Sequence, residues 1–180
     1  MIIVYNIKSE NYLEGRMKNI TYNSKEKLIK EIKFLEENTR FKNNKNFIQH
    51  GTTSIYDHVI KVAWQAIYIS EKYKLRVDLD SLIRGALLHD YFLYDWHKPH
   101  KYRHIHGFTH PYTAYKNATS ELKLNKIEKD IIIKHMFPLT VIPPRYLESW
   151  VVSLADKIVT VRETLNPKEN NYYLLEADIS

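Results

Sequence analysis

Apolar residues that recur every three or four positions constrain the fold of this chain more than any other feature of its sequence. In residues 54–73 they stand at Ile55, Val59, Val62, Ala66 and Ile69, the spacing of one face of an α-helix. The 180 residues include only four glycines, which is not typical of a hairpin-rich β protein. The pattern therefore predicts an all-α fold, a bundle of about six helices.

Helix-start signals place two further helices in the first half of the chain. Ser24 is expected to cap a helix that ends near residue 37, and Asp78 or Asp80 is expected to start another. The polar residues 38–50 and the aromatic, basic residues 91–108 are expected to be connections.

Similar signals predict three helices in the second half. Pro111 suits the first turn of a helix that begins at Thr109. Asn125 and Glu128 have the spacing of a capping box, before a helix that ends near His135. The last helix follows Pro144, and the residues expected on its inward face are Leu147, Val151, Leu154, Ala155 and Ile158.

The length of the chain suits one domain, and residues 24–165 are expected to form it. Residues 1–23 are an N-terminal segment that the pattern leaves undefined, and residues 166–180 are expected to be a C-terminal tail. The apolar run at the start is too short for a secretion signal, and no uncharged apolar stretch approaches the ~18 residues of a membrane span. The expected location is the cytoplasm.

The amino-acid composition limits which kinds of functional site and partner the chain can have. Cysteine is absent, which excludes disulfides, thiolate metal ligands and cysteine nucleophiles. The net charge of +6 invites a nucleic-acid partner, but the sequence has no nucleic-acid-binding motif. A Lys-rich solvated surface, or a small anionic substrate, accounts for the charge equally well, and no specific nucleic acid is expected.

Six polar residues stand on, or at the ends of, the apolar helical faces. A single inward histidine is usually a hydrogen-bonded core residue, but each of six would need its own partner. One shared centre of positive charge satisfies all of them together, and burial of a carboxylate without such a partner is costly. These residues are His58, His89, Asp90, His110, His135 and Asp156.

This ligand set suits transition metals. Imidazole with carboxylate favours Fe, Mn, Zn, Co or Ni over Mg or Ca. Adjacent residues on a regular helix face different ways, so His89 and Asp90 can share a metal only at a helix end. Because a carboxylate has two oxygens, Asp90 can bridge two metals.

The order of these residues resembles the HD superfamily of metal hydrolases, over about residues 48–165. The phrases that carry the resemblance are SIYDHVIKVA, RGALLHD, GFTHPYTA, IIIKHM and LADKIVTV. The two additional histidines resemble the binuclear branch, and the whole pattern is similar to small stand-alone bacterial phosphohydrolases, including those that split diadenosine tetraphosphate symmetrically. The resemblance implies an HD-domain helical bundle with two divalent transition metal ions, iron first among them.

By this resemblance, His58, His89, Asp90 and Asp156 would hold the first metal, and His110 and His135 the second, with Asp90 as the bridge. A hydroxide between the metals would be the nucleophile, because coordination lowers the pKa of water towards neutrality. The expected reaction is hydrolysis of a phosphate ester or anhydride of a nucleotide-like small molecule.

Residues around this centre are candidates for supporting roles. Lys157 follows the last ligand and, by resemblance, lies near the phosphate. Arg84 precedes the His-Asp pair by about one turn and is expected to contact substrate or a ligand. Cations between the His-Asp pair and His110 are expected to bind substrate phosphates, although a solvated polar loop is an equal reading; they are Lys98, Lys101, Arg103 and His104.

Two other readings stay open. A branch of the same superfamily holds a di-iron site in a closely similar pattern and activates oxygen, so ligand identity alone does not separate oxygenase from hydrolase. A non-catalytic module that binds RNA or protein is the third reading. The sequence leaves open whether the protein is a homodimer.

Overall fold

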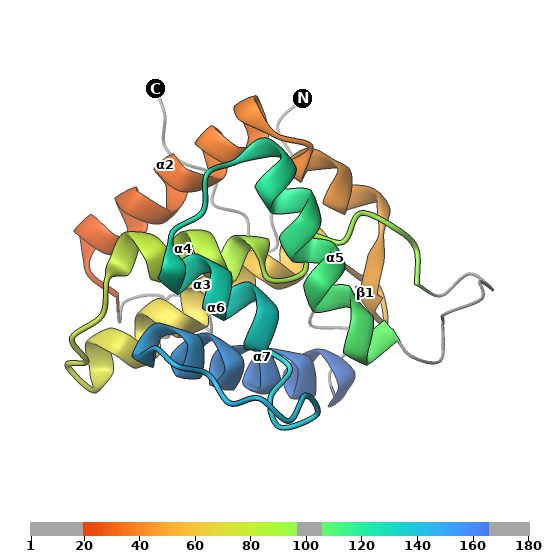
Figure 1. The fold of residues 1–180 in the computed structure, drawn as a ribbon. Coiled ribbons are helices and arrows are strands. Elements are labelled where there is room, and N and C mark those ends of the chain that lie inside the picture. The colour runs from red at the N-terminus through yellow and green to blue at the C-terminus, as the bar shows by residue number, and fades with distance from the viewer. Residues whose placement is uncertain (1–19, 97–105, 166–180) are drawn as a thin grey trace.

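Six α-helices make up most of residues 20–96 and 106–165, which the computed structural model describes (Figure 1). They are α2 (Tyr22–Asn38), α3 (Ile55–Lys72), α4 (Leu79–Leu88), α5 (His106–Glu121), α6 (Lys126–Lys134) and α7 (Leu147–Leu165). A short 3₁₀ helix, η1 (Phe41–Asn46), and two strands, β1 (Ile48–His50) and β2 (Thr53–Ser54), join α2 to α3. The predicted all-α fold is confirmed.

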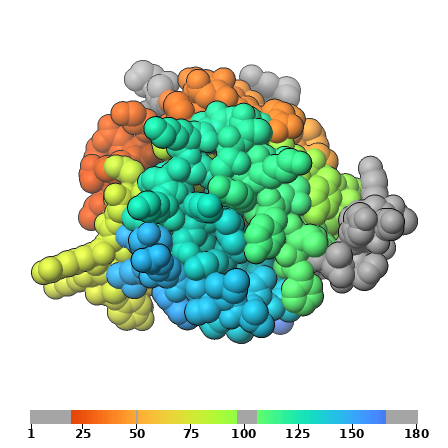
Figure 2. Space-filling model, in the orientation of Figure 1, coloured from red at the N-terminus to blue at the C-terminus, as the bar shows by residue number. Residues whose placement is uncertain are grey.

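Helices α3 and α4 form the centre of the bundle. Helix α3 packs against α4 and α7, α4 packs against α6, and α5 lies on α6. Helix α2 crosses the top of the bundle in Figure 1 and contacts α4. In the same orientation, side chains of α5, α6 and the segment before α7 cover most of the visible face (Figure 2).

The apolar face predicted for residues 54–73 is buried, and Ser54 caps the helix by accepting a hydrogen bond from the Asp57 N–H. The buried surface of α3 is wider than one stripe, since Ile60, Trp64 and Ile67 are buried as well. Helix α3 has two large neighbours, α4 and α7, and a helix with two partners must bury more than one face.

Two predicted helix starts are confirmed and two are wrong. Asp78 caps α4, and Asn125 with Glu128 forms the capping box of α6. Helix α2 begins at Tyr22 because the Thr21 hydroxyl, rather than Ser24, accepts the capping hydrogen bond. Helix α5 begins three residues before Thr109, so Pro111 lies inside it and has no N–H to donate one turn back.

The inward face of α7 is also not the one that the apolar residues predicted. Val151 and Ala155 are buried, but Leu147 and Leu154 are exposed. The buried face is rotated towards positions that carry polar side chains, which an apolar criterion ranks as outward. These buried polar residues are Glu148, Ser149, Ser153, Asp156 and Glu163.

The connection predicted over residues 38–50 contains structure of its own. Strand β1 pairs antiparallel with β2 through a turn in which Gly51 has a φ of 56°, a conformation that glycine adopts without steric cost. The hairpin matters because it places Gln49 against the interior of the bundle, where it is buried. In the described part of the chain, no helix is long and apolar enough to cross a membrane.

The contact between α4 and α6 leaves no room for a side chain at Gly85. A Cβ there would overlap Ile131 Cδ1 and lie 3.0 Å from Ile131 Cβ and Cγ2. We expect Gly85→Ala to lower the free energy of unfolding by about 1–3 kcal/mol, because overpacking outweighs the helix propensity of alanine.

Gly107→Ala is the matched control, since its Cβ would meet only the ends of two side chains, Leu139 Cδ2 at 3.0 Å and Met136 Cε at 3.8 Å. It should leave stability unchanged or raise it by up to about 1 kcal/mol. Urea denaturation of both variants measures the difference, and equal effects would contradict the close approach of α4 and α6.

Candidate metal centre

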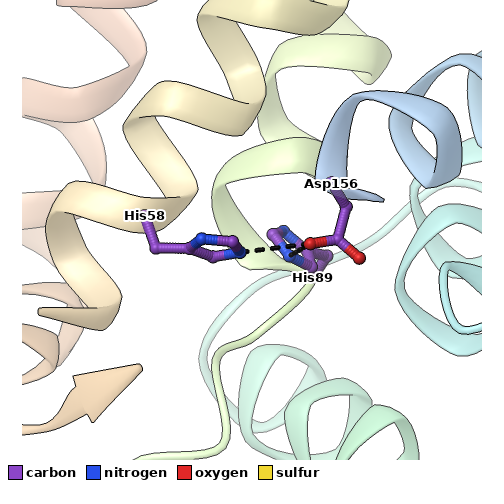
Figure 3. A group of neighbouring side chains, drawn as sticks. All are labelled: His58, His89 and Asp156. Carbon is purple, nitrogen blue, oxygen red and sulfur yellow. Dashed lines mark hydrogen bonds and ion pairs between the residues drawn. The ribbon is translucent and has the colours of Figure 1, made fainter. Parts of the chain in front are cut away.

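The six predicted ligands converge in the interior of the bundle, and none of them, taken as a whole residue, is more than 8% exposed. Five segments deliver them: α3 carries His58, α5 carries His110, and α7 carries Asp156. Helix α4 ends at Leu88, so His89 and Asp90 leave its last turn together, as the sequence predicted for a shared site. His135 directly follows the last residue of α6. Figure 3 shows His58, His89 and Asp156 facing one another from three different helices.

Asp90 lies in the middle of this cluster, and its two oxygens face two separate groups. Asp90 Oδ2 is 3.4 Å from His89 Nε2 and 3.8 Å from His58 Nε2. Asp156 Oδ1 completes this first group, at 3.2 Å from His58 Nε2 and 3.8 Å from His89 Nε2. Asp90 Oδ1 faces the second group, 3.2 Å from His110 Nε2 and 3.5 Å from His135 Nε2.

All four imidazoles are held through their other ring nitrogen, Nδ1. His89 Nδ1 donates to the Ala86 carbonyl at 2.7 Å, and His135 Nδ1 donates to the Ile132 carbonyl at 2.9 Å. His110 Nδ1 is 2.9 Å from the His106 carbonyl, and His58 Nδ1 is 2.9 Å from Glu163 Oε2. While the ring is neutral, an acceptor at Nδ1 keeps its one proton there and leaves the Nε2 lone pair facing the centre. This is the tautomer that binds metal.

The inward-facing atoms fit a cation better than they fit one another. His110 Nε2 and His135 Nε2 are 2.8 Å apart. The acceptor at each Nδ1 leaves a lone pair on each Nε2, so neither atom has a proton to donate to the other. Among the described residues, His89 Nε2 and Asp90 Oδ1 are buried and have no hydrogen-bond partner. Buried polar atoms without partners are costly, and positive ions between them would satisfy both groups. The donor set fits divalent transition metals. In each of two overlapping sets, three donor atoms lie within 4.8 Å of one another.

The protonation states of the cluster also suit metal binding. Burial acts to raise the pKa of Asp90, but His89 and His110 outweigh it and hold the pKa well below its usual range. The pKa of Asp156 is lowered in the same way, against burial, by His58 and His89. Burial, reinforced by His89, lowers the pKa of His135 to about 3. At neutral pH both carboxylates are therefore ionised and His135 is neutral, the protonation states that metal ligands require.

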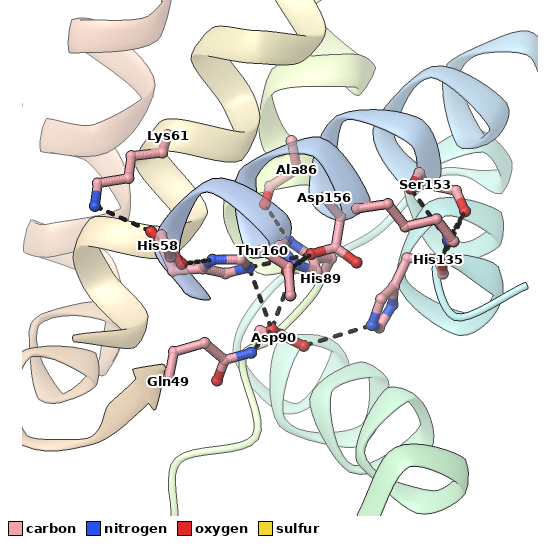
Figure 4. A network of polar contacts seen from close by, with 12 residues as sticks. Gln49, His58, Lys61, Ala86, His89, Asp90, His135, Ser153, Asp156 and Thr160 are labelled. Atoms are coloured by element: carbon pink, nitrogen blue, oxygen red, sulfur yellow. Dashed lines mark hydrogen bonds and ion pairs between the residues drawn. The ribbon is translucent and has the colours of Figure 1, made fainter. Parts of the chain in front are cut away.

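His58 differs from His135 because two carboxylates contact it. Burial acts to lower its pKa, but hydrogen bonds to Asp156 and Glu163 outweigh burial and raise the pKa to about 10. Figure 4 shows His58 together with His89, Asp90 and Asp156 in one polar network. Metal binding must therefore displace a proton from this side of the centre.

Lys157 lies at the edge of the centre. Its ammonium donates to the Ser153 hydroxyl at 2.8 Å and to the main-chain carbonyl of His135, a candidate ligand, at 3.2 Å. Burial lowers the pKa of Lys157. The structure thus puts this cation beside the second group of ligands.

Arg84 points elsewhere. Its guanidinium donates to both oxygens of Glu31 on α2, at 2.6 and 3.0 Å, and lies 3.6 Å from Glu128 on α6. Within the described residues these contacts join α2, α4 and α6, and the structure does not bring Arg84 together with the six ligands.

The predicted substrate residues Lys98, Lys101, Arg103 and His104 lie outside the described residues. The two ends of the segment that contains them are described. Trp96 stacks on His106 with ring centroids 5.1 Å apart, and His106 stacks on His110 at 4.6 Å. Stacked rings therefore connect Trp96, through His106, to the candidate ligand His110.

Sequence reasoning missed three buried residues around the centre. Gln49 Nε2 donates to Asp90 Oδ2 at 2.6 Å from strand β1, which no periodic pattern predicted (Figure 4). Glu163 and Lys61 contact each other and lie next to His58. A signal for these two was available, since Glu163 follows Asp156 by two helical turns and Lys61 follows His58 by about one.

The fold and the cluster together define an all-helical protein with a buried centre of four histidines and two aspartates. The family model of the HD domain matches residues 55–160, more than half of the chain. The chain therefore belongs to the HD domain family, which generally comprises metal-dependent hydrolases. All six candidate ligands lie inside the matched segment, whereas Gln49 and Glu163 lie outside it. No curated protein and no solved structure matches the chain significantly.

The lowered pKa of His135 predicts how the metal-free protein responds to acid. A base whose pKa falls from about 6.5 in the unfolded chain contributes stability that is present above pH ~6.5. That stability is lost as the pH falls towards the folded value of about 3. We expect the chelator-treated protein to lose more stability between pH 7 and pH 5 than a His135→Gln variant does. Urea denaturation at both pH values measures this, and equal losses would contradict the buried neutral state of His135.

Proposed function

We propose that the chain is a phosphohydrolase that works with two divalent transition metals. The observation that carries the proposal is the position of Asp90, whose two oxygens face two separate pairs of imidazole nitrogens at 3.2 to 3.8 Å. A single bound metal would need only one of these groups. Two groups that share one carboxylate are the arrangement expected of a two-metal site.

The ligand assignment follows from that division. His58, His89 and Asp156 would hold the first metal with Asp90 Oδ2, and His110 and His135 would hold the second with Asp90 Oδ1. Nitrogen and oxygen donors without sulfur suit Fe, Mn, Co, Ni or Zn, and the resemblance to the binuclear branch puts Fe first. The second group offers fewer protein donors than the first, which leaves coordination positions for water and substrate.

Bound at these positions, the metals would polarise phosphoryl oxygens and lower the pKa of a coordinated water, which supplies hydroxide as the nucleophile. The chain itself contributes orientation and access. The four Nδ1 contacts fix the imidazole rings, so no ring must rotate before ligands are in place. Asp156 and His110 have the most exposed side chains of the six, at 12% and 6%, so a substrate would approach between α7 and α5.

Cations near that opening suit an anionic substrate. Lys157 stands beside Asp156 and His135, where its ammonium can neutralise charge on a phosphoryl oxygen or leaving group. The residues Lys98, Lys101, Arg103 and His104 lie in the sequence between Trp96 and His106, whose rings stack next to His110, and we propose that they contact the phosphates. Arg84, held by Glu31, would act by fixing α4 rather than by touching substrate.

The substrate we propose is a nucleotide-like small molecule. The stacked rings of Trp96 and His106, inclined by only 4°, provide an aromatic surface beside the second group of ligands. A base could stack against such a surface while its phosphates reach the metals.

Metal analysis and turnover in the same preparation test this proposal. We expect about two transition metals per chain after anaerobic purification and release of phosphate or nucleotide from a panel of phosphate esters and anhydrides. Asp90→Ala should lose both metals and all turnover, because it removes the shared ligand. His135→Ala should retain one metal and lose at least ~100-fold in kcat, since the second metal supplies part of the catalysis.

Each alternative function has its own outcome in this experiment. Hydrolysis that persists under strict anoxia, with Mn or Co in place of Fe, excludes oxygen activation. Two irons, no hydrolysis and oxygen-dependent turnover would replace the proposal with an oxygenase. Salt-dependent RNA binding that survives Asp90→Ala, with no turnover, would replace it with a binding module.

A further inference from the structure

His58 is anchored differently from the other three histidines of the centre. Those three donate from Nδ1 to main-chain carbonyls within about one turn of their own helices. His58 instead contacts a carboxylate, Glu163 of α7, 105 residues away in the chain. The same ring therefore faces two carboxylates, Glu163 through Nδ1 and Asp156 through Nε2.

The position of His58 in its helix differs from the positions of His89 and His135. His58 is the fourth residue of α3, close to the N-terminal end of the helix. At that end the main-chain groups without helical partners are N–H donors, whereas spare carbonyls occur at the C-terminal end. His89 and His135 follow the ends of α4 and α6 and can use such carbonyls. His110, the fifth residue of α5, uses the carbonyl of the first residue of its own helix, so His58 is the one of the four that takes its acceptor from another helix.

Glu163 is buried and has its own charge partner. It is only 4% exposed, and its Oε1 lies 3.0 Å from the ammonium of Lys61, which is 5% exposed. Lys61 is on α3 about one turn after His58, and Figure 4 shows the two side by side. A buried carboxylate without a cation would be strongly unfavourable, so Lys61 keeps Glu163 ionised and available to His58.

We propose that Glu163, held by Lys61, is the positioning residue that fixes the ring of His58 for the first metal. This inference rests on the proposed two-metal function and deepens it. Glu163 contacts His58 of the first group and, in the described part of the chain, no ligand of the second group, so its effect should be confined to the site that contains His58. It also lies beyond the segment that matches the HD domain, residues 55–160.

Metal titration of variants tests the inference. The probe is Co(II), added anaerobically to chelator-treated protein and followed by its visible absorption and by competition with a chelator. We expect Glu163→Gln to weaken one of the two Co(II) equivalents by about 10- to 100-fold and to leave the other unchanged, as is usual for a partner of a ligating histidine. The absorption band of the weakened site should change shape, because His58 loses its fixed orientation.

A double variant separates positioning from folding. Glu163→Gln alone removes the carboxylate that faces the buried Lys61 ammonium and is expected to destabilise the metal-free protein. Lys61→Met combined with Glu163→Gln removes both charges and should recover the urea midpoint of the metal-free wild type to a large extent. The weak Co(II) equivalent should remain weak in this double variant.

Arg162→Gln is the matched control for the loss of a contact between α7 and α3. Arg162 is the neighbour of Glu163 on α7, and it donates to Gln65 on α3 at 2.8 Å without touching His58. It should leave both Co(II) affinities unchanged.

The outcomes distinguish this inference from the proposed function. If the folded double variant binds both Co(II) equivalents as tightly as the wild type, or if both weaken equally, the positioning role of Glu163 is overturned and the two-metal proposal stands. If the wild type binds no Co(II), the proposed function itself fails, and the inference fails with it.

Discussion

The buried carboxylate of Asp90 is the interaction on which the rest of the centre depends. Burial of an ionised carboxylate is costly, and the surrounding imidazoles keep it charged. Its two oxygens divide four histidines into two pairs, and Asp156 joins one of them. Gln49 donates to the same carboxylate from a separate strand. Five elements of the fold therefore converge on one side chain, and the arrangement of the helices is constrained by it.

Helix ends supply the geometry that this convergence requires. His89 and His135 stand just after α4 and α6, where free carbonyls hold Nδ1 and turn Nε2 inward. His58 lies near the start of α3 and relies on Glu163 and Lys61 for the same result. The same requirement, a proton fixed on Nδ1, is thus met by a main-chain carbonyl for three of the histidines and by a buried ion pair for His58. The main-chain carbonyls and the Glu163–Lys61 pair both hold the rings without bound metal, so the chain itself organises the centre.

Much of this could be predicted from the sequence. Inward histidines and aspartates stand out on periodic apolar faces, and the end of α4 after Leu88 was required for His89 and Asp90 to act together. The face of α7 could not be predicted from hydrophobicity, because its buried side carries Ser153, Asp156 and Glu163 while Leu154 is outside. The hairpin that carries Gln49 is too short to show an alternating pattern. Tertiary contacts decide such positions, and a single helix or strand does not encode them.

The central claim is that Asp90 bridges two metals, and anomalous X-ray diffraction from crystals of the metal-loaded protein tests it most directly. The account predicts two anomalous peaks about 3.5–4 Å apart, on either side of the Asp90 carboxylate. One peak should contact His58, His89 and Asp156, and the other should contact His110 and His135. A single peak, or peaks away from Asp90 in protein loaded with excess metal, would contradict the account.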